Sequence, residues 1–244
     1  MDRTRWLAER RAAVEREYTA EGPTYDAYDP ATPVHRRFVS RLIGSVPAGG
    51  FVLDAACGTA PYAGMVIEAG LSYVGADQSS GMLDVARAKW PDARFEHVGL
   101  QDLAFEGSFD GVMCTDAMEN VPPEEWPVVV SAFARALRPG GYLYLTLEEI
   151  DRAQIEEAFA TLKAAGSPTV FGEVIEGDTA GYHFYPDRER ADLWLTAAGF
   201  RPIEHADEWL DGYGYRHLLL QRRVRRRGVR DDPEPAPRRA APEV

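Results

Sequence analysis

A turn of small residues between two acids is the stretch of this sequence that could bind a ligand. An apolar run ends at Asp54, and small residues follow from Ala55 to Ala60. Small side chains let the backbone approach a ligand closely. Asp77 ends the next apolar run, nineteen residues after Gly58, and a carboxylate there can accept hydrogen bonds from both hydroxyls of a ribose. The spacing therefore predicts a ligand that contains a nucleoside, with a helix N-cap as the alternative role for Asp77.

These acids can meet only if their strands lie side by side in one sheet. From residue 51 the chain alternates apolar runs with amphipathic runs, which predicts strands and helices in turn. The predicted strands cover about 51–54, 72–77, 94–98, 109–114 and 142–147. This alternation predicts an α/β fold with a parallel, doubly wound sheet. Two closing runs, Phe200–Trp209 and Tyr215–Gln221, predict an antiparallel hairpin at its edge.

Two kinds of ligand fit the turn of small residues. A dinucleotide favours the frame G-x-G-x-x-G, of which only Gly58 is present. The other frame is D-x-G-x-G-x-G after a strand, and Asp54, Ala56, Gly58 and Ala60 occupy its four marked positions. In this form the stretch resembles motif I of the class I S-adenosylmethionine (SAM) dependent methyltransferases, with alanine at two of the three glycine positions.

Three later blocks extend this resemblance in the expected order. They are Phe109-Asp110, Asp116–Val121 and Leu137–Gly141. They resemble the FD-x-V, LEHV-like and LRPGG segments that follow motif I in this family. The resemblance covers roughly residues 38–148 and, more loosely, the closing hairpin. It implies a Rossmann-like sheet of seven strands, SAM as the cofactor and methyltransferase activity.

The resemblance also implies how the cofactor is held. Backbone amides around Gly58 would meet the methionyl group, Asp77 would hold the ribose and Met82 would lie against adenine. In the loop after the third strand, Leu100 could donate its backbone amide to adenine, and Gln101 or Asp102 could reach the exocyclic amine. The expected cofactor residues are Tyr28, Asp54, Ala55, Ala56, Gly58, Asp77, Gln78, Met82, Leu100, Gln101 and Thr115.

Methyl transfer is a displacement at a sulfonium with a neutral leaving group, so alignment of the acceptor supplies much of the rate. A hydroxyl acceptor also needs a base for its proton. The expected catalytic residues are His183, Asp116 and Glu119, with Glu148 and His35 as weaker candidates. His183 lies in the aromatic segment Tyr182–Tyr185 and is predicted to face the sulfonium. The alternative is that this segment belongs to the core.

The chain divides into three predicted parts. Residues 1–48 form an N-terminal helical lid, and the segment around Tyr25 resembles the Y-D-x-x-Y lid of many small-molecule methyltransferases. Residues 49–221 form the methyltransferase domain, with an inserted cap at about 149–186. Residues 222–244 mix Arg, Pro, Asp and Glu without apolar periodicity, which predicts a disordered tail.

Composition narrows the function further. A net charge of −12 disfavours binding to the phosphates of nucleic acids. Cys57 and Cys114 stand in no metal-ligand spacing and suit a reducing cytosol. No apolar run approaches the ~20 residues of a membrane span. We therefore expect a cytoplasmic enzyme, without a metal, that methylates an oxygen or nitrogen of a small molecule. The alternatives are a non-catalytic SAM-binding scaffold or sensor and an NAD-dependent oxidoreductase.

Overall fold

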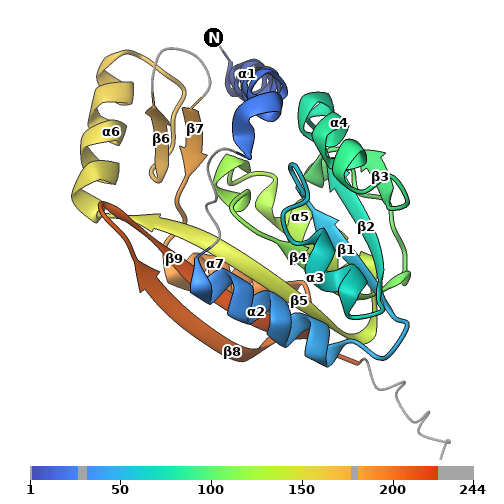
Figure 1. Cartoon of the computed structure of the whole chain (residues 1–244). Coiled ribbons are helices and arrows are strands. Elements are labelled where there is room, and N and C mark those ends of the chain that lie inside the picture. Colours follow the sequence, from blue (N-terminus) through green and yellow to red (C-terminus); the bar gives the residue numbers. More distant parts are fainter. Residues whose placement is uncertain (1, 27–31, 177–180, 225–244) are drawn as a thin grey trace, which may run out of the picture.

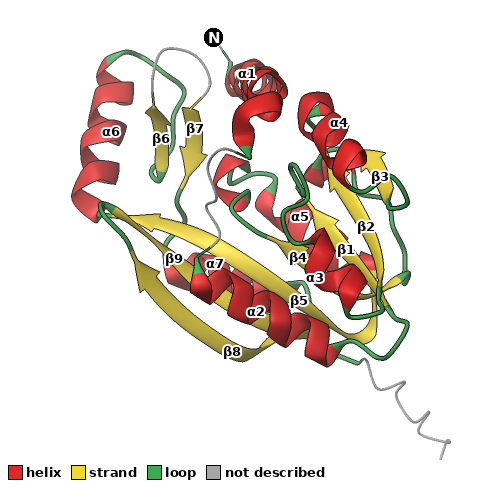
Figure 2. Ribbon diagram, in the orientation of Figure 1, coloured by secondary structure: helices red, strands yellow, loops and turns green. Residues whose placement is uncertain are grey.

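The predicted sheet is present in the computed structural model, which describes residues 2–26, 32–176 and 181–224. Within these residues seven strands form one sheet in the order β3-β2-β1-β4-β5-β9-β8 (Figures 1 and 2). Their bounds are β1 Phe51–Ala55, β2 Ser72–Asp77, β3 Arg94–His97, β4 Phe109–Cys114, β5 Leu137–Ile150, β8 Phe200–Trp209 and β9 Tyr213–Arg222. The first five strands are parallel, whereas β9 runs antiparallel to both β5 and β8. The α/β fold and its antiparallel edge hairpin are confirmed.

Strand β5 is longer than the sequence predicts. The apolar run suggests residues 142–147, but β5 begins at Leu137 and ends at Ile150. Proline and glycine usually interrupt strands, and here a shift of register against β4, between Phe109 and Gly111, accommodates them. The far end of β5 pairs with β9 up to its last residue. The hairpin therefore extends the sheet beyond the ends of the parallel strands.

Helices cover both faces of this sheet. Their bounds are α1 Arg3–Tyr25, α2 Pro33–Ser45, α3 Ala63–Glu68, α4 Ser80–Lys89, α5 Trp126–Ala136, α6 Arg152–Ala164 and α7 Arg188–Ala197. On one face Phe38 of α2 and Val66 of α3 join Val52 of β1 in an apolar core. On the other face Trp126 of α5 lies 5.2 Å from Trp194 of α7, between ring centroids. Alternate residues of the strands serve the two faces, as the pleat requires.

Capping residues determine where the helices nearest the strand ends begin. The hydroxyl of Thr32 accepts a hydrogen bond from the amide of Val34, and Pro33 takes the first position of α2. The hydroxyl of Ser79 accepts from the amide of Met82 at 3.1 Å. Helix α4 therefore starts within three residues of the end of β2, close to the carboxyl edge of the sheet.

Helix α1 lies across this carboxyl edge and packs against α4 (Figure 1). Two glycines allow the helix backbones to touch. A Cβ on Gly81 would stand 2.1 Å from the carbonyl oxygen of Thr19, and a Cβ on Gly22 would stand 2.6 Å from the backbone of Gly81. The hydroxyls of Thr19 and Ser79 share a hydrogen bond at 3.2 Å. Close backbone contact therefore holds the second half of α1 against α4.

The segment after β5 leaves the main sheet and stands beside α1 (Figure 1). It contains α6 and a separate two-stranded sheet of β6 (Glu173–Glu176) and β7 (Gly181–Phe184). The buried carboxylate of Glu173 accepts hydrogen bonds from Arg3 at 2.6 Å and from the hydroxyl of Tyr182 at 2.7 Å. The rings of Trp6 and Tyr182 meet edge to face at 5.9 Å. These contacts tie the insert to the start of α1.

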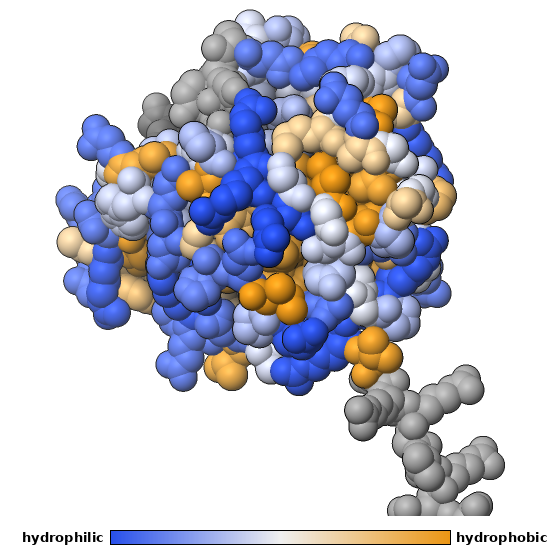
Figure 3. Space-filling view, turned by 60° about the horizontal axis from the view of Figure 1, so that its bottom comes forward, coloured by the Kyte–Doolittle hydropathy of each residue, from blue (hydrophilic) through white to orange (hydrophobic). Residues whose placement is uncertain are grey.

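Some predictions from the sequence concern residues that the structure does not describe. Tyr28 and residues 225–244 of the predicted tail lie outside the described residues, so the expectations placed on them stay predictions. Arg222, the first residue of the predicted tail, ends β9, so the strand runs one residue into that tail. The face of the molecule in Figure 3 is largely hydrophilic, and its apolar side chains lie in separate groups. None of the described helices has the length and apolar character that crossing a membrane requires.

Substitution of Gly81 by alanine should separate α1 from α4, because the new methyl group would collide with the Thr19 carbonyl. We expect a loss of roughly 1–3 kcal/mol in the free energy of unfolding, measured by urea denaturation. Gly44→Ala in α2 is the matched control, because a Cβ there meets nothing within 4 Å. Equal stability of wild type and Gly81→Ala would contradict this account of how α1 is held.

Candidate active site

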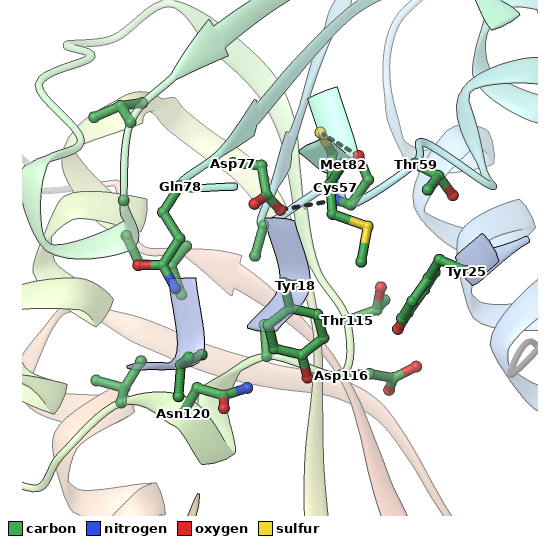
Figure 4. Close-up of a pocket in the computed structure, with 18 of the residues that line it drawn as sticks. Tyr18, Tyr25, Cys57, Thr59, Asp77, Gln78, Met82, Thr115, Asp116 and Asn120 are labelled. Atoms are coloured by element: carbon green, nitrogen blue, oxygen red, sulfur yellow. Dashed lines mark hydrogen bonds between the residues drawn. The ribbon is translucent and has the colours of Figure 1, made fainter. Parts of the chain in front are cut away.

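A cavity opens at the carboxyl ends of β1, β2 and β4, between the sheet and α1 (Figure 4). The empty space within it, part of which is open to solvent, measures about 970 Å³. Segments far apart in the sequence supply its wall. The lining residues are Arg11, Val14, Tyr18, Tyr25, Ala56, Cys57, Gly58, Thr59, Pro61, Tyr62, Asp77, Gln78, Met82, Val98, Gly99, Leu100, Gln101, Thr115, Asp116, Ala117, Asn120 and Val121.

The cavity brings together most of the residues that the sequence predicts for the site. Ala56, Gly58, Asp77, Gln78, Met82, Leu100, Gln101, Thr115 and Asp116 all line it. Four predicted residues stand away from the wall, namely Asp54, Ala55, Glu119 and His183. The proximity of the first group supports the predicted site, and the role of each residue stays a prediction.

The loop after β1 presents its backbone to the cavity. Ala56, Gly58 and Ala60 have φ angles of 59°, 52° and 59°, in the left-handed region that glycine adopts most readily. An alanine gives up roughly 1–2 kcal/mol to adopt this conformation. This geometry explains why the motif that the sequence resembles carries glycine at these positions. It also shows that the loop keeps its shape with alanine at two of them.

Asp77 holds this loop and also faces the cavity. Its Oδ2 accepts a hydrogen bond from the amide of Gly58 at 2.9 Å, and its Oδ1 accepts from the amide of Ser79 at 2.8 Å. Burial raises the pKa of the Asp77 carboxyl, and the two backbone N–H groups oppose that rise. Each carboxylate oxygen has a second lone pair that can accept a ligand hydroxyl. Ser79, and not Asp77, is the N-cap of α4, so the alternative role of Asp77 as a helix cap is wrong.

Asp54 lies beneath the loop and is fully buried. Its Oδ2 accepts a hydrogen bond from the hydroxyl of Tyr73 at 2.8 Å. Its Oδ1 has no hydrogen-bond partner in the part of the chain that the structure describes. Burial raises the pKa of this carboxyl to about 7, although the Tyr73 hydrogen bond acts in the opposite direction. Asp54 thus supports the loop from below and titrates near neutral pH.

The loop after β3 closes one end of the cavity. A Cβ on Gly99 would stand 3.3 Å from Oε1 of Gln101 and 3.6 Å from Oε1 of Gln78, so the glycine makes room for two amide side chains. The side chain of Met82, from the start of α4, is buried against the same region (Figure 4). Apolar surface with a few amide groups suits a flat heterocycle such as adenine.

The loop after β4 contributes the charged side chain Asp116 to the cavity wall. Its φ of 51° is left-handed, a conformation that Asp tolerates better than most residues. Its amide donates to the hydroxyl of Thr146 at 2.7 Å, and that hydroxyl donates to Oδ1 of Asp116 at 3.0 Å. Nε2 of the buried His35 is also 3.0 Å from Oδ1. Two buried neighbours therefore hold one oxygen of Asp116.

Glu119 is buried next to this loop and does not line the cavity. Burial, then the nearby carboxyls of Glu148 and Asp116, raise the pKa of Glu119 well above its usual range. Burial and like charge thus disfavour the charged form of Glu119, and its place outside the cavity wall does not support the predicted role of base.

His183 lies on β7 in the insert, where it pairs with Val174, and it does not line the cavity. Its Nδ1 is 3.1 Å from the hydroxyl of Tyr185. Tyr182 and Phe184, its neighbours in sequence, are buried in the main core. The structure therefore favours the alternative that the aromatic segment Tyr182–Tyr185 belongs to the core. The expectation that His183 faces the sulfonium finds no support in its position.

Sequence reasoning did not place the residues of α1 on the cavity wall. Arg11, Val14 and Tyr18 line the cavity together with Tyr25. Helix α1 is highly charged and its few apolar residues form no clear stripe, so periodicity gave no signal. Tyr25 was the exception, because it belongs to the predicted lid segment.

Comparisons with known proteins agree with this geometry. A family model described as "Methyltransferase domain" matches residues 52–141. The chain is 32% identical over 201 residues to a ubiquinone biosynthesis O-methyltransferase of Xanthomonas axonopodis pv. citri. This match covers 78% of this chain and 77% of that protein. It is 28% identical over 208 residues to a demethylmenaquinone methyltransferase of Clavibacter sepedonicus, and that match covers 80% of this chain and 78% of that protein.

Two solved structures of methyltransferases illustrate the shared fold. A SAM-dependent methyltransferase from Methanosarcina mazei has a TM-score of 0.66 and 19% identity, and the match covers 80% of this chain and 99% of that one. The 1,6-didemethyltoxoflavin-N1-methyltransferase of Burkholderia thailandensis has a TM-score of 0.63 and 17% identity, over 87% and 88% of the two chains. At these identities the structures show a shared fold.

Asp77→Asn should weaken binding of S-adenosylhomocysteine at least tenfold in titration calorimetry. An amide offers one oxygen where the carboxylate offers two, and its NH₂ group would face a backbone N–H. Hydrogen bonds to a charged group contribute roughly 1.5–3 kcal/mol each. Asp84→Asn, at an exposed carboxylate on α4, is the matched control. If both variants bind like wild type, Asp77 holds neither the loop nor the ligand.

The contribution of Asp54 to the free energy of unfolding should fall as pH rises from about 4 to about 7. Its folded pKa lies above its ordinary value, so the folded state binds more protons and loses stability as pH increases through this window. A shift of this size corresponds to about 4 kcal/mol. Urea denaturation at several pH values should show a flatter pH dependence in Asp54→Asn than in wild type. Parallel curves would refute the buried-carboxyl account.

Proposed function

We propose that this chain, which belongs to the class I SAM-dependent methyltransferase family, transfers the methyl group of SAM to a hydroxyl group of a small aromatic molecule. Family membership decides between SAM and a dinucleotide as the cofactor and makes the protein an enzyme. The acceptor and the residues that act on it are our proposal. The position of Asp116 on the cavity wall is the observation that carries it.

We propose one direction for SAM in the cavity. We place adenine between Met82 and the loop that contains Leu100, where apolar surface and amide groups meet. The ribose would then lie over Asp77, and the methionyl group would lie along the loop that contains Gly58. The sulfonium would come near Thr115, between the two ends. SAM carries no phosphate, and Arg11 is the one basic side chain among the described residues that line this wall.

Asp116 is the side chain best placed to receive the acceptor proton. Among the described residues, the hydrogen bonds to its side chain, from His35 and Thr146, both end on Oδ1. Oδ2 therefore stays available to a ligand in the cavity. A hydroxyl that donates to Oδ2 would be oriented for attack on the methyl group and would lose its proton to the carboxylate as the C–O bond forms. The methyl–sulfur electron pair leaves with S-adenosylhomocysteine.

The remaining wall supports a flat, partly apolar acceptor. Tyr18 and Tyr25 of α1, and Tyr62 at the start of α3, contribute aromatic residues to the cavity wall. Such rings bind planar molecules by stacking or edge contacts. The name of the Xanthomonas relative describes it as an O-methyltransferase of ubiquinone biosynthesis, which supports transfer to oxygen here as well.

Helix α1 and the insert would act together as a cover over this site. The ion pair between Arg3 and the buried Glu173 joins them, and Trp6 packs against Tyr182. Covering the reactants excludes water and keeps them aligned. In this proposal the insert acts through its support of α1, since His183 does not reach the cavity wall.

Asp116→Asn should lower the single-turnover rate of methyl transfer to a hydroxyl acceptor by ~10²–10⁴. The acceptor would come from a panel of phenols, catechols and matched aromatic amines, assayed with labelled SAM. Binding of S-adenosylhomocysteine should change little, since Asp116 contacts the acceptor in this proposal. His183→Asn is the matched control, because it removes a titratable group of the insert and should leave the rate within a few-fold of wild type.

Two results would overturn this assignment. A normal rate in Asp116→Asn together with a large loss in His183→Asn would move the base to the insert. Turnover with aromatic amines and with none of the hydroxyl compounds would replace the hydroxyl acceptor by a nitrogen acceptor.

A further inference from the structure

A second polar cluster lies behind Asp116, between the start of α2 and the hairpin of β8 and β9. His35 of α2, Glu208 of β8 and His217 of β9 each direct one donor atom toward the others, and these atoms all lie within 4.8 Å of one another. Both histidines are fully buried, whereas the side chain of Glu208 retains 17% exposure. The donor set of two imidazoles and one carboxylate is one that proteins use for divalent transition metals.

His217 provides an independent observation that points to a ligand. Its Nδ1 is 3.0 Å from the hydroxyl of Tyr144, which holds the ring in one orientation. Its Nε2 is buried and has no hydrogen-bond partner in the described part of the chain. That nitrogen lies 3.5 Å from Oε2 of Glu208, close to the separation of about 3.4 Å between two ligands of a tetrahedral metal ion. This contact is long for a hydrogen bond, and a metal ion between the two atoms would satisfy both of them.

His35 has the arrangement that metal-binding histidines usually show. Its Nε2 is 3.0 Å from the Asp116 carboxylate, and its Nδ1 is 2.9 Å from the hydroxyl of Thr32, which itself contacts Glu208. Histidine ligands commonly donate their second ring N–H to a carboxylate, which fixes the ring and strengthens the metal bond. The Thr32 hydroxyl also contacts Glu208 at 2.6 Å and would add a neutral oxygen beside the ion.

The charges of the cluster also favour a dication. The ion pairs described for Asp116 and Glu208 are with histidines, and not with Lys or Arg. When both imidazoles are neutral ligands, the two carboxylates balance a charge of +2. Magnesium and calcium prefer all-oxygen ligands, so the two imidazoles select a transition metal.

We propose that His35 through Nδ1, His217 through Nε2 and the Glu208 carboxylate bind a divalent transition-metal ion such as Zn²⁺. The ion joins the start of α2 to the edge hairpin. Through the ring of His35 it also fixes the orientation of Asp116 on the cavity wall. Binding of the metal does not depend on the acceptor chemistry proposed above, and only the consequence for Asp116 rests on it.

The test is titration of the full-length, chelator-treated protein with Zn²⁺ by calorimetry, at a protein concentration of tens of micromolar. Wild type should bind one equivalent. Glu208→Gln and His217→Gln should lose this binding, while His205→Gln should retain it. His205 is the matched control because it is an exposed histidine on β8, the strand that carries Glu208. Titration with Mg²⁺ should give no saturable signal.

A second measurement keeps the test decisive if His217→Gln fails to fold. Co²⁺ added to wild type should produce visible absorption bands of a four- or five-coordinate site, and Zn²⁺ should abolish them. Tyr144→Phe removes only the contact to His217 and should weaken Zn²⁺ binding by about 10- to 100-fold. Absence of stoichiometric binding in wild type, or equal binding in wild type and Glu208→Gln, would overturn the proposal. Normal binding of S-adenosylhomocysteine in the same samples would show that such a failure concerns the metal alone.

Discussion

The pair of hydrogen bonds from Gly58 and Ser79 to Asp77 is the interaction on which the rest of the site depends. One carboxylate joins the loop after β1 to the turn that starts α4, and it does so from a buried position. The loop needs this support because three of its residues are left-handed and two of these are alanines. Since α4 starts at this point, the same carboxylate also sets the position of the surface against which α1 packs.

Helix α1 carries this constraint to the other side of the cavity. Its backbone touches α4 where Gly22 and Gly81 lack side chains, so a shift of α4 would move Tyr18 and Tyr25 with it. At its opposite end, Arg3 holds the buried carboxylate of Glu173 in the insert. The cover of the site is thus assembled from segments that are separated by more than 150 residues and joined by few, specific contacts.

The contrast between local and distant signals explains what the sequence could predict. The strands, the loop around Gly58 and the acid at Asp77 are visible because each depends on a short run of residues, and their placement in one cavity agrees with the prediction. The wall formed by α1 depends on contact with α4, which no short pattern encodes. His183 was expected at the site because aromatic neighbours suggested a pocket, but Tyr182 and Phe184 serve the core and leave His183 outside the cavity wall. Asp54 belongs to the same motif as Gly58, yet the pleat turns it beneath the loop toward Tyr73.

The two halves of the cavity are built by different means, and this difference has consequences for function. In the half of the cavity where we propose that SAM binds, backbone groups and one carboxylate line the wall, and the loop keeps its shape with alanine where glycine is usual. In the half that we assign to the acceptor, side chains from α1 and from the loop after β4 form the wall, and partners in α2 and β5 hold Asp116 from behind. Under this proposal, substitutions in these side chains would change which molecule is accepted while the contacts to SAM remain. The contacts behind Asp116 continue through His35 to the rings of Tyr215 and His217 on β9, so a chain of side-chain contacts connects the edge hairpin to the part of the wall that contains Asp116.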